Sequence, residues 1–231
     1  MNNASLELGG TNWAEKDGNI LGYSVGDTSG NFSPQEFTFA RGSNLSATRI
    51  DRAGLIVKGR ENQILHSNDF SNSVYFKTRC SFTSGQTGYD SSNDAWKLEC
   101  TNIGLSYFYQ SQTITQIKTR SVYAKAGTQS TITFLWDSYN NGDFATFDLS
   151  LGTFTNAGCL AAMESVGGGW YRCSTTITDA SNGYAFLISL SNEAGANSAI
   201  GDNIYIQDAQ QEAGLAASPY IETGASTAQA G

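Results

Sequence analysis

The feature that most constrains the fold is a series of short alternating segments, between about residues 61 and 222, separated by turns rich in glycine and asparagine. In one of them, Ile132, Phe134 and Trp136 share a face, and residues 184–190 repeat the pattern. Sequences typical of tight turns, such as Asn-Asn-Gly at 140–142 and Gly-Gly-Gly at 167–169, lie between the segments. No stretch longer than ten residues has a convincing helical pattern. The chain is therefore expected to be an all-β, jelly-roll β-sandwich with an extended N-terminal arm.

Composition agrees with this fold class. Charged residues make up only 15% of the chain, whereas 25 glycines, 12 phenylalanines and 11 tyrosines suit strands that are joined by turns. The predicted strands cover residues 73–79, 94–99, 105–117, 119–125, 130–137, 143–148, 163–166, 171–178, 183–190 and 203–207.

Three regions are predicted. Residues 1–36 have no sustained hydrophobic period, so they need another surface to order them. Together with the linking strands that follow, they give an N-terminal segment, residues 1–60, for assembly and docking. Residues 61–224 form the β-sandwich body, and residues 225–231 form a flexible tail.

The net charge of −8 is unevenly distributed. Residues 1–60 hold six basic and six acidic side chains, and the remainder holds seven basic and fifteen acidic ones. Residues 41–60 contain five basic side chains and one acidic side chain, Asp51. Such a local excess of positive charge is typical of an interaction segment. The predicted docking and assembly residues are Trp13, Arg41, Arg49, Arg52, Lys58 and Arg60. The alternative is that these cations pair with the acidic body of the same chain. An acidic body argues against nucleic acid as a partner.

The cysteines and the N-terminal sequence indicate in which cellular compartment the protein is made. The four cysteines allow three pairings, none has Cys-x-x-Cys spacing, and His66 is the only histidine. We expect four free thiols packed in the core. The N-terminus lacks a secretory pattern and no segment is long and apolar enough to span a membrane, so we expect synthesis in a cytoplasm and no membrane insertion.

Catalytic constellations are not apparent. A Ser-His-Asp set would depend on His66 alone. The carboxylates that a glycosidase would need, Asp137, Asp143, Asp148 and Glu164, fit the solvated surface of an acidic protein. We therefore expect no enzymatic activity. No cofactor is expected either, although the loops at 141–143 and 201–203 hold oxygen ligands that Ca²⁺ could use.

Sugar binding has a physical rationale at one strand end. Trp136 and Tyr139 offer aromatic faces that can stack on a sugar ring, and Asp137 and Asn140 offer groups for its hydroxyls. These four residues are the predicted glycan site. The alternative is that Trp136 faces the core and Tyr139 caps a hairpin.

Five motifs occur in a characteristic order. They are the aromatic-x-Phe-Arg-x-Ser opening at 37–43, the Ala-Thr…Asp…Gly-x-Ile step at 47–56, the Glu-Asn-x-Ile-Leu run at 61–71, Gly-Trp-Tyr-Arg at 169–172 and the Ala-Gln-x-Glu…Tyr-Ile ending at 209–221. In this order they resemble fibre, spike and decoration proteins of tailed bacteriophages. The ending departs from the family pattern, since Ala216-Ala-Ser-Pro-Tyr-Ile replaces Pro-Thr-Ser-x-Tyr-Ile.

The resemblance implies a function and partners. It predicts a non-enzymatic virion structural protein, such as a head fibre, decoration protein or tail appendage, assembled in the bacterial host cytoplasm as a homotrimer. Capsid or tail proteins and host surface glycans are the implied partners. A free-standing carbohydrate-binding module or lectin, a glycan depolymerase and a purely architectural protein are the alternatives.

Overall fold

The computed structural model describes residues 13–16, 19–24, 34–36, 48–50, 56–58, 60–111, 117–136, 143–178, 185–190 and 197–230. The chain divides into two compact units, residues 1–42 and 43–231. The first unit contains a three-stranded antiparallel sheet, β1 (Trp13–Lys16), β2 (Asn19–Ser24) and β3 (Pro34–Glu36).

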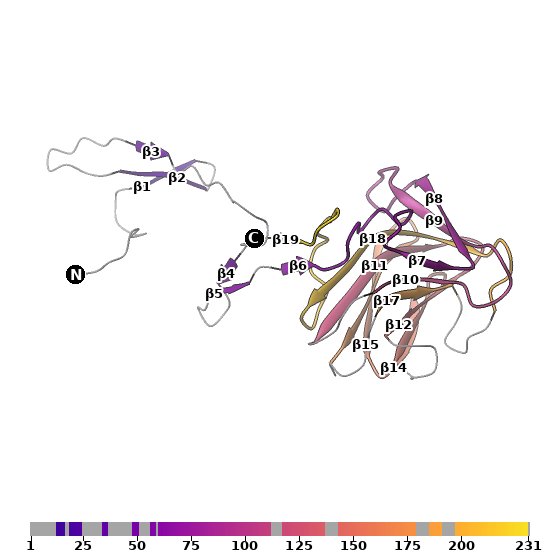
Figure 1. Ribbon diagram of the computed structural model, residues 1–231. Coiled ribbons are helices and arrows are strands. Elements are labelled where there is room, and N and C mark those ends of the chain that lie inside the picture. Colours follow the sequence, from indigo (N-terminus) through magenta and orange to yellow (C-terminus); the bar gives the residue numbers. More distant parts are fainter. Residues whose placement is uncertain are drawn as a thin grey trace, which may run out of the picture. The chain divides into compact units, whose positions relative to one another are not determined.

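The second unit is an antiparallel β-sandwich of two six-stranded sheets (Figure 1). The first sheet has the order β14 (Thr153–Ala157), β13 (Phe144–Asp148), β12 (Thr131–Leu135), β17 (Ala185–Ser189), β10 (Tyr107–Ser111) and β7 (Phe76–Thr78). The second sheet has the order β15 (Leu160–Gly167), β16 (Trp170–Ile177), β11 (Lys118–Ala126), β18 (Asn203–Ala213), β9 (Ala95–Cys100) and β8 (Cys80–Gln86). Two short pairs complete the unit, β4 (Thr48–Ile50) with β5 (Ile56–Lys58) and β6 (Arg60–Asn62) with β19 (Ala228–Ala230). The prediction of an all-β sandwich is confirmed.

Each predicted strand overlaps a strand of the structure, but β8 and β14 were missed. Both are edge strands. All five residues of β14 are exposed, and no residue of β8 is fully buried, so neither strand has the clear apolar alternation of a strand that covers a core. Strand β18 continues to Ala213, well past its predicted end at residue 207. Asp208 interrupts its alternation with a φ of 58°, beside an irregularity in its pairing with β11.

The core lies between the two sheets and follows the alternation of the central strands. Ile132, Phe134 and Trp136 have no exposed surface, which confirms their common face. The second sheet supplies Val122 and Ile206 from the opposite side.

All four cysteines are free, and they lie in this core or against it. Burial raises the pKa of Cys80 to about 12 and that of Cys159 to about 11. These side chains therefore act as small apolar residues.

Asn62 joins two motifs that lie far apart in the sequence. Its Nδ2 donates to the carbonyl oxygens of Ala209 and Ile221 at 3.0 and 2.8 Å. Its Oδ1 accepts from the backbone N–H groups of Ile64 and Gln211, both at 3.1 Å. The side chain is fully buried, so these bonds satisfy all of its polar capacity away from water. The run at 61–71 and the ending at 209–221 are therefore one structural unit.

Further bonds extend this junction. The backbone N–H of Ser67 donates to Thr223 Oγ1 at 3.1 Å, and the N–H of Thr223 donates to Ser67 Oγ at 2.9 Å. Beyond it, β19 pairs with β6, so residues 228–230, which were expected to belong to a flexible tail, are hydrogen-bonded to the start of the sandwich.

Candidate ligand-binding surface

The outer face of the second sheet carries the most distinctive surface of the described residues. Side chains of residues paired across a sheet point to the same side. Strand register therefore forms one row from Trp170, Lys125, Tyr205 and Lys97. The adjacent outward row contains Glu164, Arg172, Tyr123 and Gln207.

An aromatic stack lies over this second row. The rings of Tyr89 and Tyr123 are 3.8 Å apart between centroids and inclined by only 9°. The guanidinium carbon of Arg172 lies 5.4 Å from the Tyr123 ring. Tyr123 and Trp170 are buried beneath this layer, and Tyr89 and Tyr205 are half-buried at its surface. The layer thus combines a packed base with partly accessible rings.

The loop that carries Tyr89 is fixed to the sheet by Gln207. Gln207 Oε1 accepts from the backbone N–H of Tyr89 at 3.1 Å, and its Nε2 donates to Asp94 at 2.7 Å. Gly88 permits this close approach, because a Cβ there would lie 2.2 Å from Gln207 Oε1. The Tyr89 hydroxyl also donates to Asp208 Oδ2 at 2.9 Å, so both ends of this side chain are positioned.

Asp208 gives this loop an unusual charge state. Its side chain is only 6% exposed. Burial raises the pKa of Asp208 to about 7, the hydrogen bond from Tyr89 opposes the rise, and the charges of Asp94, Asp90 and Glu222 add to it. The carboxyl therefore exchanges its proton near neutral pH, directly beneath the aromatic stack.

The segment after β18 covers the other side of the same face. Arg172 Nη2 donates to the carbonyl oxygen of Ser218 and, at 3.3 Å, to Ser121 Oγ. The backbone N–H of Ser218 donates to Glu212 Oε1 at 2.7 Å. Gln210 Oε1 accepts from the N–H of Ile221 at 2.8 Å. These bonds hold residues 214–221 over the sheet and create the wall of a groove.

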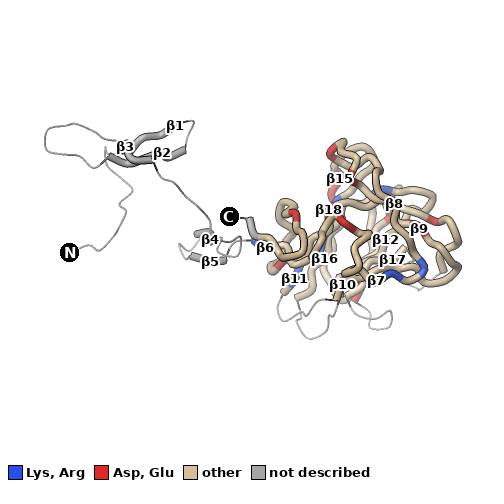
Figure 2. Tube along the Cα trace, turned by 45° about the horizontal axis from the view of Figure 1, so that its top comes forward, with Lys and Arg blue, Asp and Glu red and all other residues tan. Residues whose placement is uncertain are grey.

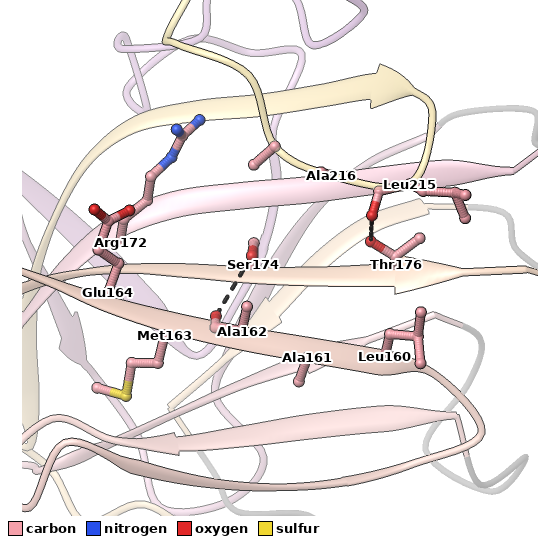
Figure 3. Close-up of a pocket in the computed structure, with 11 residues that line it drawn as sticks. Leu160, Ala161, Ala162, Met163, Glu164, Arg172, Ser174, Thr176, Leu215 and Ala216 are labelled. Atoms are coloured by element: carbon pink, nitrogen blue, oxygen red, sulfur yellow. Dashed lines mark hydrogen bonds between the residues drawn. The ribbon is translucent and has the colours of Figure 1, made fainter.

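That groove has a volume of about 270 Å³ (Figure 3). It is open because small side chains, including Ala162 and Ser174, face it, with Ala216 in the covering segment. Its ends differ in chemistry, since Leu160 and Leu215 lie on the side opposite Glu164 and Arg172 in Figure 3. The remaining lining residues are Ala161, Met163, Thr176 and Ala217.

A second hollow, of about 380 Å³, is lined by Gln86, Thr87, Lys125 and Tyr205. It offers an amide, a hydroxyl, an ammonium group and an aromatic ring. On β16, Thr176 lines the groove, and Trp170 lies on the row of Lys125 and Tyr205, which line the second hollow. The distance along the strand between Thr176 and Trp170 is about 20 Å. Tyr123 lies on the row next to that of Lys125, but it is buried under Tyr89, so Tyr89 and Tyr205, rather than Tyr123, are accessible to a ligand.

The first sheet has a different aromatic surface. Phe76 and Tyr109 stack at 4.9 Å with an angle of 14°, and Tyr107 lies 6.4 Å from Tyr109. Phe76 is 53% exposed. This surface is formed by aromatic rings of β7 and β10.

The predicted glycan site is only partly described. Trp136 is fully buried, so the alternative that it faces the core is correct and it offers no face to a sugar. Asp137, Tyr139 and Asn140 lie outside the described residues. Two other tryptophans are packed within the protein. Trp170 is buried, and Trp96 packs against the core and donates from Nε1 to the Asn68 carbonyl at 2.9 Å.

The predicted docking residues are not brought together by described contacts. Trp13, Arg49 and Lys58 lie in β1, β4 and β5, for which the structure describes the backbone alone, and Arg41 and Arg52 lie outside the described residues. Arg60, in β6, is exposed. Figure 2 shows basic and acidic positions scattered over the sandwich.

Carboxylates that were considered for hydrolysis have other surroundings. Asp148 Oδ1 accepts from the N–H groups of Ser150 and Leu151 at 2.9 and 3.0 Å, which closes a turn. Glu164 lies at the groove, and Asp137 lies outside the described residues. In the predicted calcium loop at 201–203, Asp202 accepts from the Ala199 N–H at 2.7 Å.

The described part of the chain contains no group of three or more His, Cys, Asp or Glu side chains that is placed to hold a metal ion. No helix among the described residues is long and apolar enough to cross a membrane.

Comparisons with known proteins give distant structural similarity alone. No protein-family model and no curated protein match the sequence. Among solved structures, a mutant of the carbohydrate-binding module CBM29-2, complexed with cellulohexaose, is similar at 9% identity with a TM-score of 0.40, over 67% of this chain and 93% of that one. The enzymatically active domain of tailspike protein 4 from bacteriophage CBA120 is similar at 16% identity with a TM-score of 0.39. That alignment covers 65% of this chain and 21% of the tailspike chain.

The sequence pattern alone did not identify the residues of this surface as a site. Tyr123 and Lys125 alternate with core residues in β11, and Tyr205 and Gln207 do so in β18. Alternation therefore marked them as outward-facing, which was an available signal. Their adjacency depends on the pairing of β11 with β18, which alternation does not specify.

Proposed function

We propose that this chain is a non-enzymatic virion structural protein whose sandwich binds host surface glycans along the outer face of its second sheet. The observation that carries glycan binding is the occurrence, on one face of the sheet, of two partly accessible rings, Tyr89 and Tyr205, and of two hollows lined by hydroxyl, amide and charged groups. Such a surface suits a chain of sugar rings, which have apolar faces and polar rims.

The geometry favours binding through preorganisation. Tyr89 is held at its backbone by Gln207 and at its hydroxyl by Asp208, so it loses little conformational freedom when a ligand packs on it. The surface is shallow, and we expect weak binding by one copy. Display of three or more copies on a particle would convert weak contacts into avidity.

The virion role rests on the five ordered sequence motifs. Asn62 and the bonds around it show that two of these motifs maintain the sandwich and its C-terminal segment. In the proposal, the N-terminal segment and its cations attach a homotrimer to capsid or tail proteins. This leaves the outer face of the sandwich available to ligands.

Three measurements test the proposal. Purified full-length chain should bind a subset of bacterial surface glycans saturably on an array, without releasing shortened products. It should also form a trimer by light scattering, and it should co-sediment with virions from the lysate of cells that carry its gene. A monomer that binds glycans but is not found on particles would favour a free-standing lectin, which the same outer face supports. Release of shortened glycans would contradict the non-enzymatic assignment.

A further inference from the structure

The hollow at Tyr205 contains a cation that the protein does not neutralise. Lys125 lines it together with Gln86, Thr87 and Tyr205, and no acidic side chain is among these residues. In the described structure Lys125 makes no ion pair, although the chain as a whole carries a net charge of −8. An acidic protein therefore leaves one ammonium group open beside an aromatic ring.

The two other cations on these two rows, Lys97 and Arg172, already have partners within the protein. Lys97 lies 2.7 Å from Glu99, with which it forms an ion pair. Arg172 donates to the Ser218 carbonyl and to Ser121 Oγ. Of these three cations, Lys125 is the one whose side chain has neither an ion pair nor a hydrogen bond in the described part of the chain.

The backbone beside Lys125 leaves room for this side chain. The turn at 167–169 has positive φ at each of its three glycines. A Cβ at Gly169 would lie 3.6 Å from Lys125 Cε, an ordinary van der Waals contact, so this turn lies directly beside the lysine stem. The register also places Lys125 directly opposite Tyr205, on the same face of the sheet.

We infer that this hollow binds the anionic group of an acidic saccharide, a uronate carboxylate or a sulfate ester, with the sugar ring packed on Tyr205. The inference rests on the proposed glycan-binding function and specifies its substrate class. Lys125 would pair with the anion, and Gln86 and Thr87 offer hydrogen-bonding groups for neighbouring hydroxyls. In the groove at the other end, by contrast, Arg172 has an acidic residue, Glu164, as its register neighbour.

The experiment uses isotope-labelled full-length protein, titrated with glucose, glucuronate and glucose 6-sulfate while amide shifts are followed by NMR. We expect one of the anionic sugars to bind about fivefold more tightly than glucose at low salt, as a partly exposed ion pair allows. The largest shifts should lie at Gln86, Thr87 and Tyr205. Preference for glucuronate would identify a carboxylate, and preference for the 6-sulfate would identify a sulfate ester.

Lys125→Gln should remove the preference, and Lys77→Gln is the matched control. Lys77 is exposed on β7 of the first sheet, so its replacement changes net charge equally without altering the hollow. A preference that survives Lys125→Gln, or equal binding of all three sugars, would overturn the inference. So would an absence of shifts with each sugar. If the array shows binding of neutral glycans in any of these cases, the proposed function stands without this inference, whereas an array without binding would overturn both.

Discussion

The guanidinium carbon of Arg120 lies 3.6 Å from the centre of the Trp136 ring, and both side chains are fully buried. Arg120 Nε donates to Gln211 Oε1 at 3.0 Å, and Nη1 donates to the Leu135 carbonyl at 2.9 Å. Burial lowers the pKa of Arg120, since no described carboxylate compensates its charge. The ring face and these acceptors thus replace part of the water around a buried cation, although Nη2 has no hydrogen-bond partner among the described residues. They also link β11 of one sheet to the end of β12 in the other.

Replacing Trp136 should therefore affect stability. We expect Trp136→Ala to lower the free energy of unfolding by about 3–5 kcal/mol, because it leaves a cavity and removes the ring above Arg120. Trp136→Phe, which retains a ring, should cost less. Urea denaturation followed by circular dichroism measures both. A Trp136→Ala variant of normal stability that had lost glycan binding would restore the original assignment of Trp136 to the sugar site.

Asn62 should be equally important to the fold. Asn62→Ala leaves two buried carbonyl oxygens and two N–H groups without their partner, and we expect a loss of at least about 3 kcal/mol. Hydrogen exchange should rise at the amides of Ile64 and Gln211, which donate to Asn62 Oδ1. The control is Asn72→Ala, because Asn72 is only partly buried and bonds within its own turn. Similar exchange in both variants would contradict the role of Asn62 as the junction of two motifs.

Asp208 should make stability depend on pH. Its pKa is about 7 in the folded protein against an ordinary value of 3.8. The folded state therefore holds the proton more tightly, and this contribution to stability is complete below pH 4 and is lost as the pH rises through 7, by at most about 4 kcal/mol. Asp208→Asn tolerates the positive φ and can still accept from Tyr89. We expect the variant to match the wild type near pH 4 and to exceed its stability at pH 8.

Asp148 supplies the control for this titration. Burial alone would raise its pKa, but hydrogen bonds from Ser150 and Leu151 lower it. Its contribution is present above its ordinary pKa and is lost as the pH falls. Asp148→Asn should therefore be less stable than the wild type at pH 7, with a difference that shrinks toward pH 3. If the Asp208 and Asp148 variants showed the same pH trend, the assignment of the raised pKa to Asp208 would be wrong.

Tyr205 and Tyr109 distinguish the two aromatic surfaces. Because Tyr205 is half-buried on the outer face of the second sheet, Tyr205→Ala should weaken glycan binding about tenfold and leave the fold intact. Tyr109→Ala removes an equivalent ring from the first sheet and should leave affinity unchanged. Titration of a glycan identified on the array, together with urea denaturation of each variant, provides the measurement. The reverse result would place the ligand on the first sheet.

Much of the fold follows from local pattern. The alternation in 132–136 predicted which side chains of β12 are buried, and the spacing of turns predicted most strands of the sandwich. Edge strands β8 and β14 were not predicted, because they cover less of the core and so have a weaker apolar pattern. The length of β18 was also missed, since Asp208 disrupts its two-residue period.

The candidate surface depended on contacts between distant residues. Side-chain alternation in β11 and β18 was an available signal that Tyr123, Lys125 and Tyr205 point away from the core, but no such prediction was made from it. The sequence left two interpretations of Trp136, and its complete burial in the core decided between them. Likewise, Tyr89 and Tyr123 stack although 34 positions separate them in the sequence. The amino-acid sequence by itself thus determined the strands and which faces they bury, whereas strand order and loop placement decided which outward side chains form a site, since those depend on long-range pairing.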